Sequence, residues 1–218
     1  MIKTVIFDMD GVIVDTEPLH FEVSKGQLAE LGIELTEELH NTFTGNSNKT
    51  IFKKLKEEHG LNRSVDELIE AKNLLFIQAF KDTQDIKMLP GVLNLIIDLH
   101  KNGMQLLLAS SSEHEIIDMV FERFNLVQYF THKISGDDFA ESKPSPDIFL
   151  KAVELSGDEK ENCIVIEDSA NGIKAAKSAG LYCIAYKGEA EGQDQSLADE
   201  IVYDFADLNF DKIRKINS

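Results

Sequence analysis

Short apolar runs alternate with segments of helical periodicity throughout the second half of the chain, from about Leu89 onward. Strands that alternate with helices predict a parallel sheet covered by helices on both faces. A further apolar run, Thr4–Phe7, is expected to join this sheet as a strand. The sequence therefore predicts an α/β, doubly wound parallel-sheet core. The expected strands of the second half are residues 105–109, 132–135, 163–166, 183–186 and 200–203, and the expected helices are residues 92–99, 113–124, 146–155 and 172–179.

Residues 16–85 carry a different pattern, in which apolar residues such as Ile51 and Leu55 recur at three-to-four spacing. This pattern predicts a compact unit of about four helices, inserted after the first strand. We therefore expect an α/β catalytic core made of residues 1–15 and 86–218, and an inserted all-helical cap domain made of residues 16–85.

The formal net charge of the 218 residues is −17. Such a surface repels nucleic acid and anionic membranes, so we expect neither as a partner. Cys163 and Cys183 lie in apolar runs and are expected to be buried free thiols, which fits a cytoplasmic location. Asp8 and Asp10 interrupt the N-terminal apolar stretch, which argues against a signal peptide, and no run approaches ~18 apolar residues.

Polar side chains follow three of the predicted strands at their carboxyl ends, and a lysine lies in a loop before a helix. In a doubly wound sheet, ligands bind beyond the carboxyl ends of the strands, so we expect these groups to form one site. Crowded carboxylates are unfavourable unless a positive group lies among them, and Mg²⁺ together with a phosphoryl group would supply it. The residues are Asp8, Asp10, Ser110, Ser111, Ser112, Lys143, Glu167 and Asp168.

Some of these residues also have simpler structural interpretations. Asp10-Gly11 is a common turn pair, although a turn does not explain Asp8. Ser112 and Glu115 match a capping box at the start of the following helix, and this is the interpretation that we favour for Ser112.

For the serine at the strand tip, the lysine and the second acid pair, a functional interpretation is favoured over a structural one. Ser110 is expected at a strand tip that faces a helix N-terminus, where free N–H groups bind phosphate. An isolated lysine is usually solvated, but Lys143 directly precedes Pro144 in a loop at the same sheet edge, where it can neutralise both a phosphate and a nucleophile. Glu167 and Asp168 could cap the next helix, yet two acids directly after an apolar strand fit metal ligation better.

The order of these groups resembles the haloacid dehalogenase superfamily of phosphotransferases over essentially the whole chain. Within the superfamily, the chain is most similar to the β-phosphoglucomutase-like branch, which also contains sugar-phosphate phosphatases. The segment Asp15-Thr16-Glu17-Pro18-Leu19-His20 matches the hinge segment of that branch. The resemblance implies a Rossmann-like core with a small helical cap. It rests on four ordered motifs, which are Asp8-Met9-Asp10-Gly11-Val12, Ser110, Lys143-Pro144 and Glu167-Asp168.

The resemblance also implies a mechanism. Asp8 would attack phosphorus and form an aspartyl phosphate, and Asp10 would serve as general acid and base. Phosphate oxygens would be held by Ser110, Ser111 and Lys143. The Mg²⁺ ligands would be the Asp8 carboxylate, the Asp10 main-chain carbonyl and Asp168, with Glu167 beside them. The family often has a cis peptide before the motif-three proline, which makes Lys143-Pro144 a candidate. The dehalogenases that name the superfamily lack the second aspartate and need no metal, so Asp10 argues against that activity.

A phosphatase and a mutase of this branch would both begin by phosphorylating Asp8. The cap residues discriminate between these two reactions. Mutases of this branch carry an arginine in the cap loop to bind a second phosphate, whereas Asn48 stands at that position here and Lys49 follows it. Lys72 resembles the second cap lysine of the mutases, and His20 is also retained, although an exposed helical position would explain His20 equally well. We favour a phosphatase because an arginine that binds a phosphate bidentately is difficult to replace, and we retain β-phosphoglucomutase as the alternative.

A phospho-aspartate signalling domain is the alternative from a different class, because it also combines an aspartate, a hydroxyl and a lysine on a parallel sheet. The helical insertion argues against it, since a cap shields a site from water. Asp10 argues against it too, since a switch has no leaving group to protonate. We therefore expect a Mg²⁺-dependent enzyme that acts on a small phosphorylated metabolite, in particular a sugar phosphate, and that is a monomer.

Overall fold

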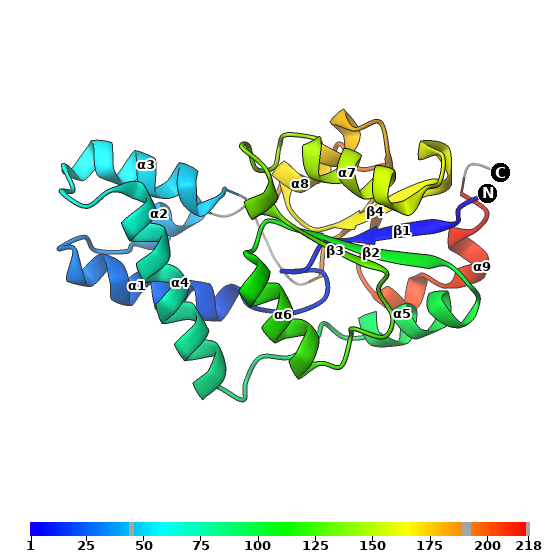
Figure 1. The fold of residues 1–218 in the computed structure, drawn as a ribbon, viewed down its shortest axis with the longest axis horizontal. Coiled ribbons are helices and arrows are strands. Elements are labelled where there is room, and N and C mark those ends of the chain that lie inside the picture. The colour runs from blue at the N-terminus through cyan, green and yellow to red at the C-terminus, as the bar shows by residue number, and fades with distance from the viewer. Residues whose placement is uncertain (44–45, 189–192, 217–218) are drawn as a thin grey trace. The chain divides into compact units, whose positions relative to one another are not determined.

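The computed structural model describes residues 1–43, 46–188 and 193–216, and the chain divides into two compact units (Figure 1). One unit comprises Met1–Asp15 and Met88–Ser218, and the other comprises Thr16–Lys87. The chain leaves the first unit after its first strand and returns at Met88, which forms an antiparallel bridge with Val14. This return point lies two residues later than the junction expected from the sequence.

The first unit is built on a parallel sheet, which in the described residues has six strands in the order β3-β2-β1-β4-β5-β6. The central strand is β1, because its apolar run is buried on both faces and pairs on one side with β2 and on the other with β4. This order is that of a doubly wound α/β fold, so the fold class predicted from the sequence is confirmed. The strands are β1 (Thr4–Phe7), β2 (Gln105–Ser110), β3 (His132–Ser135), β4 (Cys163–Glu167), β5 (Tyr182–Tyr186) and β6 (Glu200–Val202).

Helices cover both faces of the sheet (Figure 1). On one face lie α7 (Asp147–Ser156) and α8 (Ala170–Ser178), and on the other lie α5 (Val92–Lys101), α6 (His114–Arg123) and the short α9 (Phe210–Ile213). The sequence pattern predicted all of these helices except α9, which has four residues and is too short to show a helical period. The remaining helices in the described part of this unit are the 3₁₀ turns Gly136–Asp138, Lys160–Asn162 and Phe205–Asp207.

The core beneath α7 and α8 explains why the strands read as apolar runs. Alternate residues of neighbouring strands, such as Ile6, Leu107 and Val165, pack with Phe149 of α7 and Ile173 of α8. Successive side chains of a strand point to opposite faces, so a strand covered on both faces must be apolar throughout. Both cysteines are free and buried, as expected from the sequence.

The second unit is helical, with α1 (Glu17–Glu30), α2 (Glu37–Asn41), α3 (Asn48–His59) and α4 (Val65–Asp82). Serine side chains cap the N-termini of two of these helices. Ser47 caps α3, and Ser64 forms a capping box with Glu67 at α4. The unit has its own apolar core, which consists of Leu28, Ile33, Leu35, Phe43, Ile51, Phe52, Leu55 and Leu68. No helix in the described part of either unit is long and apolar enough to cross a membrane.

Candidate active site

The register of the sheet brings the residues that follow β1 and β4 to one edge. Phe7 is paired with Leu108 of β2 and with Ile166 of β4, so the next residue of each strand lies at the carboxyl end of the sheet. Asp8 continues the pairing, because its N–H donates to the carbonyl of Ile166 at 3.0 Å. The expectation that the strand ends share one site therefore holds for Asp8, Ser110 and Glu167, which end or follow the three central strands.

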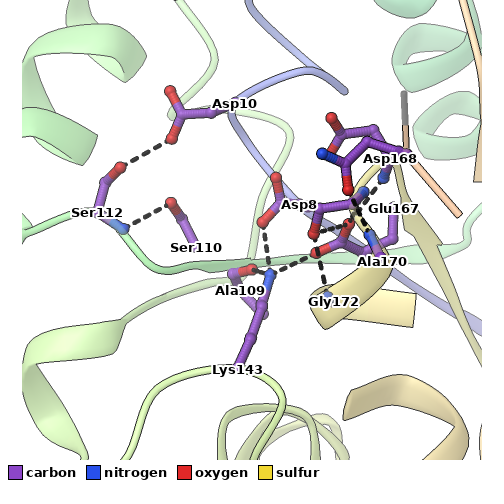
Figure 2. Close-up of polar contacts among 12 residues, drawn as sticks. Asp8, Asp10, Ala109, Ser110, Ser112, Lys143, Glu167, Asp168, Ala170 and Gly172 are labelled. Atoms are coloured by element: carbon purple, nitrogen blue, oxygen red, sulfur yellow. Dashed lines mark hydrogen bonds and ion pairs between the residues drawn. The ribbon is translucent and has the colours of Figure 1, made fainter. Parts of the chain in front are cut away.

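Lys143 lies at the centre of this group (Figure 2). Its Nζ donates to Asp8 Oδ1 at 2.6 Å, to Glu167 Oε1 at 2.9 Å and to the carbonyl of Ala109 at 3.0 Å. The residue is 7% exposed, so the interpretation of a solvated lysine is wrong. Burial by itself would lower the pKa of Lys143, but the two carboxylates outweigh it and hold the pKa above its usual value. The Lys143-Pro144 peptide bond is cis, as the resemblance implied.

Three carboxylates gather around this lysine. Oxygens of Asp8, Glu167 and Asp168 all lie within 4.8 Å of one another. Burial raises the pKa of Asp8 to about 8, with Glu167 and Asp10 adding to the rise and Lys143 opposing it. Burial, with Glu167 and Asp8, also raises the pKa of Asp168. One lysine therefore does not offset the negative charge of the cluster, and a cation would.

The donor set fits Mg²⁺. It consists of oxygen ligands from carboxylates, which Mg²⁺ prefers, and the described residues of the cluster include no thiolate or imidazole. The turn after β1 is also shaped for this cluster. Gly11 has φ +80°, and a Cβ on it would lie 2.2 Å from Asp168 Oδ2, so glycine allows the carboxylate to approach the turn.

Glu167 is held in place by the start of α8. Its Oε2 accepts the N–H groups of Asp168 and Ser169, each at 2.7 Å. A Cβ on Gly172 would lie 1.6 Å from Glu167 Oε1, so a larger residue there would displace the carboxylate. The helix cap itself is Ser169, whose side chain accepts the N–H of Gly172. The alternative in which Glu167 or Asp168 caps α8 is therefore wrong for the N-cap position.

Ser112 differs from what the sequence suggested. The capping box of Ser112 with Glu115 is absent, because α6 begins at His114 after Glu113, and Glu113 has no side-chain cap bond. Instead, Ser112 Oγ donates to Asp10 Oδ2 at 2.8 Å, and its N–H donates to Ser110 Oγ at 3.0 Å (Figure 2). Ser110 is buried and Ser111 is exposed at the same strand end.

The residues predicted for the helical unit lie on several of its helices. Lys72 of α4 is 8% exposed, and its Nζ donates to Asn48 Oδ1 at 2.7 Å. Lys49 is exposed on α3, and the His20 ring of α1 stacks on Phe76 with centroids 4.3 Å apart. The cap loop at residues 44–49 is described only from residue 46, so its first two residues lie outside the described part.

Sequence reasoning did not identify Gln195. This residue is 6% exposed, and its Nε2 donates to the carbonyl of Asp168 at 2.6 Å and to that of Tyr186 at 2.9 Å. It therefore ties the acidic turn after β4 to the end of β5. No local pattern marks it, because a single glutamine in a polar segment resembles a solvated loop residue.

A doubly wound sheet with a buried lysine among carboxylates at its carboxyl edge defines an α/β enzyme core. A family model described as haloacid dehalogenase-like hydrolase matches residues 5–186. The chain belongs to this family.

Individual relatives include both phosphatases and a mutase. A phosphorylated carbohydrates phosphatase of Thermotoga maritima is 32% identical over 184 residues, which are 82% of this chain and 82% of that protein. A β-phosphoglucomutase of Bacillus subtilis is 29% identical over 218 residues, covering 98% and 94% of the two chains. The crystal structure of CbbY from Rhodobacter sphaeroides in complex with phosphate has a TM-score of 0.87 and 28% identity, and the match covers 95% of this chain and 96% of that one.

Proposed function

We propose that this protein is a Mg²⁺-dependent phosphatase that acts on a small phosphorylated metabolite, in particular a sugar phosphate, through an aspartyl-phosphate intermediate. The observation that carries the proposal is the position of Lys143 Nζ between Asp8 Oδ1 and Glu167 Oε1. A buried cation at this place can neutralise both an attacking carboxylate and an incoming phosphoryl group.

Asp8 is the proposed nucleophile. Its carboxylate lies at the tip of the central strand and is anchored by the main-chain bond to Ile166 and the side-chain bond to Lys143. The carboxylate attacks phosphorus in line with the bond to the leaving oxygen. A covalent acyl phosphate forms, and water then hydrolyses it.

Asp10 is the proposed general acid and base. It lies two residues beyond Asp8 in the turn closed by the bond from Gly11 N–H to the carbonyl of Val14 at 2.9 Å. Asp10 gives a proton to the leaving oxygen in the first step and takes one from the attacking water in the second.

The remaining groups hold the phosphate and the metal. Ser110, Ser111 and Lys143 are proposed to bind the phosphoryl oxygens. The Asp8 carboxylate, the Asp10 main-chain carbonyl and Asp168 are proposed to hold Mg²⁺, with Glu167 beside them. When bound, Mg²⁺ neutralises charge on the carboxylates and on the transferring phosphoryl group.

Hydrolysis is favoured over mutase chemistry by the helical unit, which we infer to act as a cap. Asn48, which takes the position of the mutase arginine, is hydrogen-bonded to Lys72. A neutral amide cannot make the bidentate, charge-assisted bonds to a second phosphate that an arginine makes. Relatives named as phosphatases support this choice, whereas the similarity to a β-phosphoglucomutase keeps the mutase as the second candidate.

The test is a product assay with Mg²⁺, with and without a chelator. β-Glucose 1-phosphate is supplied with a trace of glucose 1,6-bisphosphate, and free phosphate and glucose 6-phosphate are followed together. Free phosphate without isomerisation is expected, followed by selection among sugar phosphates in a wider panel. Glucose 6-phosphate without matching phosphate release would instead establish the mutase. No turnover of any phosphate ester would overturn both candidates.

A further inference from the structure

Ser112 connects two groups of the proposed active site that come from distant parts of the chain. Its hydroxyl donates to Asp10, which is 102 residues away in sequence, and its N–H donates to Ser110. Because α6 starts without a side-chain cap, helix capping does not account for the placement of this hydroxyl. Its described side-chain partner is the carboxyl of Asp10.

The main chain of Ser112 is itself held by β3. Ser135, the last residue of that strand, is fully buried, and its Oγ donates to the carbonyl of Ser112 at 2.7 Å. The same Oγ accepts the N–H of Asp137 at 3.1 Å. A Cβ on Gly136 would lie 2.9 Å from the carbonyl oxygen of Ser111, so these two segments are in close contact. The Ser112 hydroxyl is therefore presented from a fixed backbone.

The main chain of Asp10 lies in the turn after β1. The turn after β1 fixes its backbone through the bonds of Val12, Ile13 and Val14 N–H to the carbonyl of Met9, but such bonds do not orient a side chain. Asp10 is half-buried, so its carboxyl also meets solvent. The bond from Ser112 adds an orienting contact that lasts through the reaction, since Oδ2 accepts from the hydroxyl both in the carboxylate and in the acid whose proton is on the other oxygen.

We propose that Ser112 is a positioning residue that holds the Asp10 carboxyl in the orientation needed for proton transfer. The inference rests on the proposed role of Asp10. In the first step the proton moves from Asp10 to the leaving oxygen as the P–O bond breaks. The Ser112 hydroxyl donates to Oδ2 before and after this transfer, and it neither gains nor loses a proton. Ser112 acts through Asp10.

The experiment compares two substrates that differ in their need for a general acid. One is a sugar phosphate that the wild-type enzyme hydrolyses, whose alkoxide is a poor leaving group. The other is p-nitrophenyl phosphate, whose leaving group departs without protonation. The value of kcat/KM is measured for Ser112→Ala, Asp10→Asn and the double variant. The inhibition constant of inorganic phosphate, measured alongside, reports on the phosphate site.

For Ser112→Ala we expect kcat/KM for the sugar phosphate to fall about 10- to 100-fold, which is the effect of losing a hydrogen bond to a charged group. The value for p-nitrophenyl phosphate and the inhibition constant should change little. Ser112→Thr keeps the hydroxyl and should restore most of the lost rate. The double variant should be no slower than Asp10→Asn, because both changes disable one proton transfer.

Three results would overturn the inference. Equal losses on both substrates would mean that Ser112 supports the phosphate site rather than Asp10. Unchanged rates would mean that the bond to Asp10 has no role in turnover. Additive losses of kcat/KM in the double variant would mean that Ser112 and Asp10 act independently. If Ser112→Ala does not fold, Ser112→Cys, which is a weak donor, takes its place in the comparison. Absence of any wild-type turnover would instead overturn the proposed function and the positioning role with it.

Discussion

Lys143 Nζ lies 2.6 Å from Asp8 Oδ1, and both side chains are buried at the carboxyl end of the central strand. The two residues are 135 positions apart in sequence. Their ion pair is shared with Glu167, so a single ammonium group faces two carboxylates. Both the proposed nucleophile and the stability of the buried carboxylates therefore depend on Lys143.

Removal of the nucleophile should abolish turnover. Asp8→Asn keeps the size of the side chain but removes its charge, so the aspartyl phosphate cannot form. We expect phosphate release to fall by at least about 10³-fold while the circular dichroism spectrum is unchanged. Asp207→Asn, at an exposed position, is the matched control and should retain full activity. Substantial turnover by Asp8→Asn would refute the assignment of the nucleophile.

Loss of the lysine should affect stability as well as activity. At a pH above the pKa of Asp8, Lys143→Met leaves two ionised carboxylates, Asp8 and Glu167, buried without their cation, and breaking a buried ion pair in this way costs about 3 to 5 kcal/mol. Chemical denaturation in the presence of a chelator measures the effect. Lys151→Met removes an exposed lysine of α7 that pairs with Glu154, and should change the free energy of unfolding little. Equal stability of the two variants would contradict a structural role for the Lys143 pair.

Divalent cations should stabilise the protein through the acidic cluster. Binding to the folded state alone raises the free energy of unfolding by about 2.7 kcal/mol when the cation is at 100 times its dissociation constant. Thermal unfolding with and without Mg²⁺ should therefore differ in the wild type. Asp168→Asn removes one of the three clustered carboxylates and should reduce the difference. The same Mg²⁺ response in both proteins would place the ion elsewhere.

Stability without a cation should fall as the pH rises. Asp8 has a pKa of about 8 in the folded protein against an ordinary value of 3.8. The folded state therefore holds more protons than the unfolded state between these values, and the free energy of unfolding decreases with pH across that interval. The contribution is at most about 1.4 kcal/mol per pH unit. Asp8→Asn should show a shallower decline in a chelator, and Mg²⁺ should remove the difference. Parallel pH profiles would show that Asp8 does not titrate in this range.

The sequence by itself determined the fold class and grouped most residues of the candidate site. Strand and helix periodicities are local signals, so the strands Thr4–Phe7 and His132–Ser135 could be predicted to the residue. The carboxyl ends of parallel strands meet at one edge, so the chemistry of Asp8, Ser110 and Glu167 could be grouped from their places after apolar runs.

The tertiary structure decided what no local pattern contains. Ser112 carries the local signature of a helix cap, but its hydroxyl donates to Asp10, which lies in the turn after β1. Gln195 reaches Asp168 from a polar segment without a motif. Lys143 was expected at this sheet edge, but its contact with Asp8 Oδ1 at 2.6 Å depends on how its loop packs there. Hydrogen bonds of this kind depend on distances between segments far apart in sequence, which sheet register and loop packing set and residue spacing does not.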